Sequence, residues 1–283
     1  MAVLALDLGG TKLAAALVDG ASVLTRQEVA TDRAGGAAAW MAAIGDLVRG
    51  WKYDCAGMAV TGLVRDGLWR ALNPGTLPVP DDFPLLGALR ASLGVPLIAR
   101  NDAQAAAWGE YRFGGVDGPT MLFVTVSTGI GGGLVLDGRL VTGRSGLTGH
   151  LGIAPVDTEA GVKLLEDVAS GSALARLADR RATPREVTAA AARGEPWAET
   201  LLDAVLAPMA LSLRRLQLEL DPDCVVIGGG LGLAPGYLDR LGRHLAPVPA
   251  MMRPCLRAAA LGADAGLIGI ADLALHDLTE AHA

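Results

Sequence analysis

The sequence predicts an α/β protein with two domains, and three observations carry this prediction. Apolar segments of strand length alternate with longer amphipathic segments of helical length along the 283 residues. A strand, a glycine-rich turn and a second strand occur at the start of the chain and again after residue 120. Hydrophobic residues make up 51% of the chain, enough to bury a core in each half.

The first half begins with three apolar segments joined by short turns, the pattern of antiparallel hairpins. Gly94 follows a helical segment and is a plausible helix C-cap. The expected strands cover residues 3–8, 13–18, 23–29, 55–60, 68–72 and 96–99, and the expected helices cover 37–49, 85–93 and 102–111.

The second half repeats the opening pattern and then becomes mainly helical. The glycine-rich segment 113–119 is the expected domain boundary. The expected strands cover 121–126, 134–136 and 224–227, and the expected helices cover about 166–180, 184–193, 196–219 and 264–277. We therefore expect a smaller α/β domain of residues 1–117 with the C-terminal helix (about 268–283), and a larger α/β domain of residues 118–267.

Composition and charge exclude several classes of protein. The net charge is −6 and no basic stripe is visible, which argues against nucleic acid as a partner. No apolar run is long enough to span a membrane, and the first strand begins at Val3 without a signal-peptide pattern. Cys55, Cys224 and Cys255 form no metal-binding spacing, so we expect three buried thiols in a cytoplasmic protein.

Three glycine turns that follow strands predict a nucleotide site held between the two domains. Backbone N–H groups in such turns can bind phosphate, and the acidic residue of the first turn can hold magnesium. A glycine-rich hairpin without a ligand is the alternative for the first turn. The candidate ATP- and phosphate-binding residues are Asp7, Gly9, Gly10, Thr11, Lys12, Thr128, Gly129, Gly131, Gly132, Gly229 and Gly230. A Walker A loop is absent, and the first turn leads into a strand, unlike a Rossmann turn.

Asp102 is the candidate general base, since phosphoryl transfer to an alcohol needs one group that accepts the hydroxyl proton. Asn101 precedes it and suits hydroxyl recognition, although Asn and Asp are also common helix N-caps. Asn73, His150 and Glu166 are further polar residues in glycine-rich or apolar surroundings. Taken alone, His150 could be a structural histidine and Glu166 a helix-start acid.

Three segments resemble the ROK family of sugar kinases and repressors, namely 7–12, 101–106 and 128–133. The resemblance extends to Gly228–Gly230 and to 264–269. It implies an actin-like (ribonuclease H-like) two-domain sugar kinase fold, usually dimeric, that uses ATP and Mg²⁺, with Asp102 as the base. The substrate-binding residues that it implies are Gly62, Asn73, Asn101, Asp102, His150 and Glu166.

Within that family, segments 60–67, 71–74, 101–110 and 146–152 are most similar to bacterial N-acetylmannosamine kinases. His150 stands where many family hexokinases carry Glu. This similarity implies phosphorylation of the 6-hydroxyl of N-acetylmannosamine, a step of sialic acid catabolism. The alternative is a hexokinase of the same family that acts on glucose or another hexose.

One departure from the family concerns zinc. Relatives usually carry a His three residues after position 150 and a CxCxxxxC cluster before position 166. Here Ile153 replaces that His, and no cysteine lies between residues 56 and 223. We therefore expect no structural zinc, and we expect the loop 154–165 to be held by burial of Val162, Leu164 and Leu165. Ile153 also leaves the preferred hexose open.

Two other functions are less well supported. Family repressors carry an N-terminal helix-turn-helix domain, for which a chain whose first strand begins at Val3 leaves no room. A sugar-binding protein without catalysis would not need Asp7, Asp102 and all three glycine turns. A sugar kinase remains the best interpretation.

Overall fold

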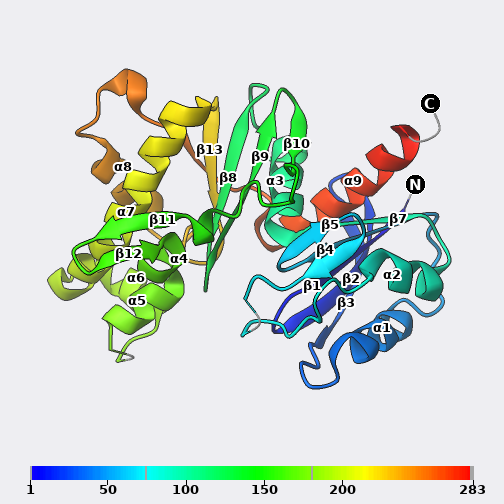
Figure 1. Cartoon of the computed structure of the whole chain (residues 1–283). Helices are drawn as coiled ribbons and strands as arrows, with labels where there is room; N and C mark the ends of the chain where they lie inside the picture. Colours follow the sequence, from blue (N-terminus) through cyan, green and yellow to red (C-terminus); the bar gives the residue numbers. More distant parts are fainter. Residues whose placement is uncertain (1, 74, 180, 281–283) are drawn as a thin grey trace. The chain divides into compact units, whose positions relative to one another are not determined.

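The computed structural model describes residues 2–73, 75–179 and 181–280 (Figure 1). Contacts divide the chain into two compact units. Unit 1 comprises Met1–Gly114, Thr142–Thr148 and Ala263–Ala283, and unit 2 comprises Gly115–Val141 and Gly149–Gly262. The chain thus passes from unit 1 to unit 2 and returns twice.

Unit 1 is built on a five-stranded sheet with the order β3-β2-β1-β4-β7. Strands β1 to β3 pair antiparallel as consecutive hairpins, whereas β4 and β7 add in parallel. The strands are β1 (Val3–Leu8), β2 (Lys12–Asp19), β3 (Ser22–Ala30), β4 (Ala56–Val60) and β7 (Leu97–Asn101). A separate hairpin is formed by β5 (Leu63–Arg65) and β6 (Leu68–Arg70).

Successive side chains of a strand point to opposite faces of the sheet. In this sheet one face carries large residues and the other carries small ones. Leu4, Leu6 and Leu8 of β1 pack in a core with Trp40 and Leu89, which come from two of the helices. Small residues of the same sheet let another helix, α9, lie against β1 and β4. The helices of unit 1 are α1 (Gly36–Leu47), α2 (Leu85–Leu93), α3 (Asp102–Phe113) and α9 (Ala265–Glu280), drawn from blue to red in Figure 1.

Helices α3 and α9 pack closely because glycines stand where they meet. A Cβ atom at Gly269 would collide with the backbone oxygen of Ala105, and one at Gly109 would crowd the backbone of α9. Trp108 Nε1 donates a 2.7 Å hydrogen bond to Asp272, which fixes the two helices along their length. The start of α3, where Asp102 lies, is therefore held by the packing of α9.

Unit 2 repeats the topology of unit 1. Its sheet has the order β10-β9-β8-β13-β14, again with three antiparallel strands followed by two parallel ones. This confirms the internal repeat that the strand–turn–strand pattern predicted. The strands are β8 (Met121–Val126), β9 (Ile130–Leu136), β10 (Arg139–Val141), β13 (Cys224–Gly228) and β14 (Leu256–Ala258).

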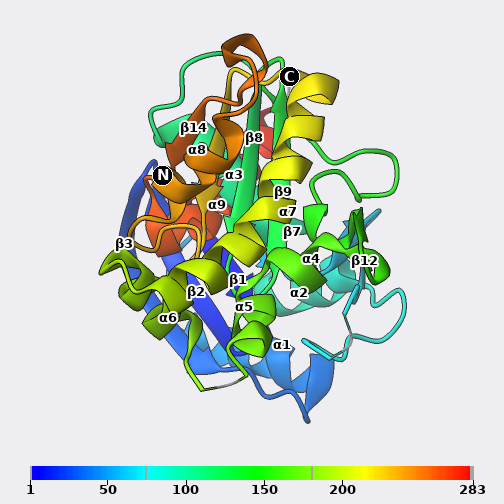
Figure 2. The same cartoon turned by 90° about the vertical axis from the view of Figure 1, so that its left-hand side faces the viewer.

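The helices of unit 2 pack on one face of this sheet. Leu202, Leu206 and Met209 of the long helix α7 share a core with Val124 and Ile227 of the strands. Figure 2 shows α7, in yellow, in front of the strands of unit 2. The helices are α4 (Leu165–Ala169), α5 (Gly171–Leu177), α6 (Pro184–Ala192), α7 (Pro196–Leu220) and α8 (Tyr237–Leu245). The remaining elements are the hairpin β11 (Pro155–Thr158) and β12 (Gly161–Leu164), and the 3₁₀ turns η1 (Leu151–Ile153), η2 (Ala250–Met252) and η3 (Gly262–Asp264).

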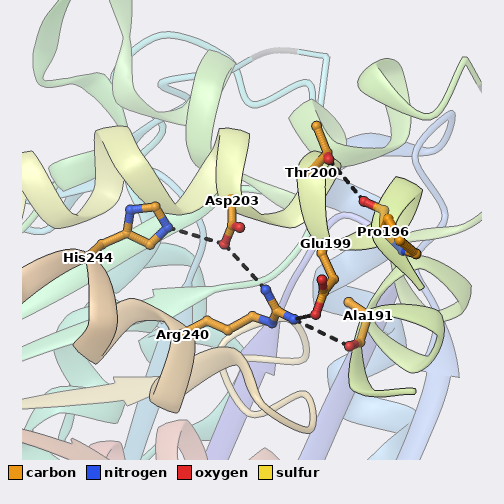
Figure 3. Close-up of polar contacts among 7 residues, drawn as sticks. All are labelled: Ala191, Pro196, Glu199, Thr200, Asp203, Arg240 and His244. Atoms are coloured by element: carbon orange, nitrogen blue, oxygen red, sulfur yellow. Dashed lines mark hydrogen bonds and ion pairs between the residues drawn. The ribbon is translucent and has the colours of Figure 1, made fainter. Parts of the chain in front are cut away.

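A largely buried arginine ties three of these helices together (Figure 3). Arg240 of α8 bonds Glu199 of α7 and lies 3.6 Å from Asp203, and it also donates to the backbone oxygen of Ala191 in α6. His244 Nε2 is 3.2 Å from the same Asp203 carboxylate. A buried charge needs such partners, so this cluster fixes α8 against α6 and α7.

Four expectations about local structure are wrong in part. The helix expected at 166–180 is divided in two at Ser170. This residue ends α4 and is the N-cap of α5. Gly131–Gly133 belong to β9, which therefore begins at Ile130 and not at residue 134, where this strand was expected to start. Of the loop residues expected to be buried, Leu165 is buried, but Val162 is 70% exposed and Leu164 is also exposed, because they lie on a two-stranded hairpin without a covering layer. Cys55 and Cys224 are buried, whereas Cys255 is exposed.

Candidate functional site

Two carboxylates mark the candidate site in unit 1. Asp7 lies near the end of β1, and Asp102 is the first residue of α3, directly after β7. Strands β1, β4 and β7 are parallel, so their carboxyl ends meet at one edge of the sheet. The two aspartates are close enough for the charge of Asp102 to act on Asp7.

The pKa values of both carboxyls are raised to about 6. For Asp7 the causes are removal of water by burial and then the negative charge of Asp102, opposed by Lys12 and Arg26. For Asp102 the main cause is again burial, opposed by hydrogen bonds from the Ala103 backbone and Asn101. A carboxyl that titrates near neutrality suits proton transfer in a reaction.

Asn101 holds Asp102 in place from the N-cap of α3. Its Oδ1 accepts hydrogen bonds from the N–H groups of Ala103 (3.0 Å) and Gln104 (3.2 Å), and its Nδ2 donates to the backbone oxygen of Gly62 (3.0 Å). The side chain is only 6% exposed. The N-cap interpretation is thus confirmed, and hydroxyl recognition by Asn101 stays a prediction.

The first glycine turn lies beside the segment that contains Asn73 and Thr76. Gly9 N–H donates to Lys12 O (3.0 Å), and a Cβ atom at Gly10 would come within 2.7 Å of the Thr76 backbone oxygen. Thr76 N–H in turn donates to Asn73 O (2.9 Å). The structure therefore brings the turn and this segment together within unit 1.

Two polar residues of the same turn face outward. Thr11 is exposed, and the ammonium group of Lys12 lies 3.6 Å from Glu28 on β3. An exposed ion pair of this kind is weak, so it would release Lys12 easily to a phosphate. A phosphate-binding role for Thr11 and Lys12 stays a prediction.

The second glycine turn, in unit 2, is held by its neighbours in the fold. Ser127 N–H donates to Gly129 O (2.9 Å), which closes the turn between β8 and β9. The start of α5 adds two bonds, from Gly171 N–H to Ser127 O (2.8 Å) and from Ser172 N–H to Thr128 O (3.0 Å).

The other predicted phosphate-binding glycines of unit 2 lie outside this turn. Gly131 and Gly132 lie within β9, and a Cβ atom at Gly132 would come within 2.6 Å of Phe123 O and 3.0 Å of Gly149 O. Gly229 follows β13 with φ of +84° and lies against the Val126 backbone, so a side chain there would be strained as well as crowded. Gly230 lines the pocket described next.

A pocket of about 930 Å³ lies within unit 2. Hydroxyl groups and glycines line part of it, and small apolar side chains line the rest, which suits a ligand with a polar and a flat apolar part. Its residues are Ser127, Thr128, Gly171, Ser172, Ala175, Thr183, Pro184, Arg185, Thr188, Ala189, Gly230, Leu231, Leu233, Ala234 and Pro235.

Most of these pocket residues were missed by the sequence reasoning, which found only Thr128 and Gly230. Arg185 is the most notable omission, because its guanidinium forms no hydrogen bond or ion pair with the described residues. The residues come from α5, α6 and the turn after β13, and no local motif links these segments. The start of α6 itself was visible in the sequence, because Thr183 and Glu186 have the spacing of a capping box and Pro184 stands at the first helical position.

His150 and Glu166 are the two predicted sugar-binding residues of unit 2. His150 is partly buried and immediately precedes η1. Glu166 lies in the first turn of α4, and its Oε2 accepts a 3.0 Å hydrogen bond from the backbone N–H of Ile130. Glu166 is therefore a helix-start acid that also reaches the second glycine turn.

The loop 154–165 lacks the Cys and His side chains that the family resemblance associates with zinc. No three or more His, Cys, Asp or Glu side chains in the described residues gather as metal ligands, and the loop 154–165 has no Cys or His. The loop is closed instead by a 2.9 Å hydrogen bond from Leu165 N–H to Ala154 O and by burial of Val156.

No helix within the described ranges is both long and apolar enough to cross a membrane.

The chain is similar to several proteins along almost its full length. A protein from Brucella melitensis named bifunctional enzyme NanE/NanK is 48% identical over 277 residues, which cover 96% of this chain and 54% of that protein. The chain therefore spans about half the length of this relative. An N-acetylmannosamine kinase from Salmonella typhimurium is 39% identical, with 98% of this chain and 99% of the relative covered.

Solved structures agree in fold. A ROK family glucokinase from Streptomyces griseus, in complex with glucose and AMPPNP, superposes with a TM-score of 0.83 at 30% identity and covers 98% of this chain and 100% of its own. The ROK hexokinase from Thermus thermophilus gives a TM-score of 0.81 at 35% identity, covering 99% and 100%. These matches confirm the two-domain actin-like sugar kinase fold.

The family model described as "ROK family" matches residues 3–277, which include every predicted site residue in both units. The chain belongs to the ROK family.

Proposed function

We propose that this protein is an ATP-dependent carbohydrate kinase that phosphorylates the 6-hydroxyl of N-acetylmannosamine. The observation that carries the proposal is Asp102, a carboxyl with a pKa of about 6 at the start of α3, held by Asn101 and next to Asp7. The name of the Salmonella relative, N-acetylmannosamine kinase, supports this substrate. The Streptomyces structure with AMPPNP supports ATP as the phosphate donor.

In the proposed reaction, Asp102 in its ionised form accepts the proton of the sugar 6-hydroxyl. The sugar oxygen forms a bond to the γ-phosphorus of ATP, and the bond from that phosphorus to the bridging oxygen breaks, which leaves ADP. Gly62, Asn73, Asn101, His150 and Glu166 are the proposed sugar-binding residues. Catalysis of this type depends mostly on position and charge, so the N-cap that fixes Asp102 matters as much as its acidity.

Magnesium would be held by Asp7, because Mg²⁺ commonly uses one or two carboxylates together with phosphate oxygens. When bound, the ion neutralises charge on the phosphates. The negative charge of Asp102 contributes to the raised pKa of Asp7. A cation bound next to Asp7 would offset that charge and lower the Asp7 pKa.

The pocket of unit 2 is the proposed ATP site. Ser127, Thr128 and Gly230 would face the phosphates, and the apolar part around Leu233 and Pro235 would receive the adenine ring.

The domain division is a further proposal. We propose that residues 1–117 with 268–283 form one domain and residues 118–267 the other, and that both are needed for phosphate transfer. A homodimer, a cytoplasmic location and the absence of structural zinc are further proposals that rest on the family resemblance and on the missing zinc ligands.

A second candidate is a kinase for glucose or another hexose. Ile153, which replaces the family's His and is 44% exposed, removes one imidazole from this part of the fold. The Streptomyces relative is a glucokinase in complex with glucose. The two candidates differ only in the sugar, so they share the roles of Asp102 and the unit 2 pocket.

A substrate panel is expected to separate the two candidates. With ATP and Mg²⁺ in excess, kcat/KM for N-acetylmannosamine should exceed that for glucose, fructose and allose by tenfold or more, about 1.4 kcal/mol in transition-state binding. A coupled assay of ADP release measures this, with N-acetylglucosamine as the matched N-acetyl sugar. If glucose, fructose or allose has the higher kcat/KM, the second candidate is correct.

Activity is also expected to depend on pH through the two carboxyls. A general base works only when deprotonated, and the pKa of Asp102 is raised to about 6, so kcat/KM should be nearly constant above pH 7 and fall below pH 6. Stopped assays of sugar phosphate between pH 5 and 8.5 measure the profile, with far-UV circular dichroism at each pH to check folding. A rate that stays constant down to pH 5 would show that no group with a pKa near 6 must be ionised.

A further inference from the structure

One contact in unit 2 links a proposed sugar-binding residue to the proposed ATP site. Glu166 of α4 reaches across to the start of β9, where its Oε2 accepts a 3.0 Å hydrogen bond from Ile130 N–H. The residues just before Ile130 are Thr128 and Gly129, and Thr128 lines the nucleotide pocket. The carboxylate is thus bonded to the backbone that the phosphates of ATP would meet.

The contact is part of a larger support around this turn. Gly171 and Ser172 at the start of α5 donate to Ser127 O (2.8 Å) and Thr128 O (3.0 Å), which fixes the first half of the turn. Glu166 fixes the second half from the preceding helix. The two helices meet at Ser170, a fully buried residue whose Oγ accepts a 3.1 Å bond from Ala173 N–H.

Two glycines make room for the carboxylate. A Cβ atom at Gly129 would collide with Oε2 of Glu166, and one at Gly152 would lie 3.3 Å from the same oxygen. The other oxygen, Oε1, has no hydrogen-bond partner in the described part of the chain. The side chain can therefore bond the turn through one oxygen and keep the other for a substrate hydroxyl.

We propose that Glu166 is a positioning residue for the nucleotide: through Ile130 N–H it holds the turn Ser127–Gly129 in the shape that binds the phosphates of ATP. This rests on the proposed function of the unit 2 pocket. The reason is that a short glycine turn has many backbone conformations, and a bond from a charged acceptor restricts them before the ligand arrives.

The charge of Glu166 makes the proposal sharply testable. A carboxylate beside a phosphate site repels the ligand, so if charge alone mattered, removing it would strengthen nucleotide binding. If position matters, the effect depends on whether the replacement can still accept the Ile130 N–H bond. Glutamine keeps an acceptor oxygen at the same reach without charge, whereas aspartate keeps the charge on a shorter side chain.

The experiment measures binding of AMPPNP with Mg²⁺ to the full chain by isothermal titration calorimetry, without sugar. Glu166→Ala and Glu166→Asp are each expected to raise Kd by roughly tenfold, the effect of losing one hydrogen bond to a charged group. Glu166→Gln is expected to stay within about threefold of the wild type. Asp167→Ala is the matched control, since it removes an exposed acidic side chain from the same helix and should leave Kd unchanged.

Contrary outcomes are distinct. Tighter binding in both Glu166→Ala and Glu166→Gln would mean that repulsion dominates, and equal Kd values for Glu166→Asp and the wild type would mean that the Ile130 contact is irrelevant; either result overturns the inference. If Glu166→Ala does not fold, as judged by its thermal unfolding, the Gln and Asp variants decide. A wild-type protein that does not bind AMPPNP would instead contradict the proposed function itself.

Discussion

Replacing Asp102 with asparagine is expected to lower kcat by about 10²–10⁴-fold, the contribution typical of a general base. The amide has nearly the same shape but cannot accept the proton of the sugar hydroxyl. Asn101 would still cap α3 through its bonds from the N–H groups of Ala103 and Gln104, and an asparagine at position 102 keeps an oxygen for the Ala103 N–H that Asp102 Oδ1 also accepts at 2.8 Å. Sugar affinity should therefore change little, while the chemical step becomes slow.

Steady-state rates with N-acetylmannosamine and ATP, together with calorimetric sugar binding, measure the two effects separately. Asp81→Asn is a suitable control, since it makes the same chemical change at an exposed position of unit 1. The pH profile adds a second check, because the fall in rate below pH 6 should disappear if Asp102 causes it. Near-normal turnover of Asp102→Asn would remove this residue from the role of base.

Replacing Gly269 with alanine is expected to destabilise unit 1 by about 1–3 kcal/mol or more, as overpacking does in tight cores. The new methyl group would collide with the backbone oxygen of Ala105, and backbone cannot rotate away as a side chain can. Helices α3 and α9 would have to separate. Because α3 begins at Asp102, activity should fall even under conditions where the protein stays folded.

Gly87→Ala in α2 is the matched control. Gly87 is an exposed helical glycine of the same unit with no atom within 4 Å of the added Cβ. Alanine is a better helix former by about 1 kcal/mol, so this variant should be slightly more stable than the wild type. Urea unfolding curves followed by circular dichroism measure both. A Gly269→Ala variant as stable as Gly87→Ala would show that α3 and α9 do not need this close approach.

The order and type of most elements could be predicted from the sequence, because each depends on local pattern. Short apolar segments joined by tight turns predicted β1 to β3, and Gly94 does end α2 with a left-handed φ of +68°. The helix break at Ser170 was missed because the apolar residues continue on both sides of it, although Ser170 is a favoured N-cap and Gly171 a poor helix former. The exposed Val162 was predicted wrongly because hydrophobicity alone does not say whether another layer covers a hairpin.

The candidate site shows the same division. The sequence by itself determined that Asp7 and Asp102 stand at the ends of strands and that glycines follow β1, β8 and β13. Each of these features lies within a short run of consecutive residues. Only the tertiary structure decided the pKa of about 6 for both aspartates, since burial and the proximity of the two charges depend on how separate strands pair. It also decided the pocket around Arg185 and the bond from Ile130 to Glu166, because those contacts join segments that are distant in sequence and no local pattern encodes the distance between them.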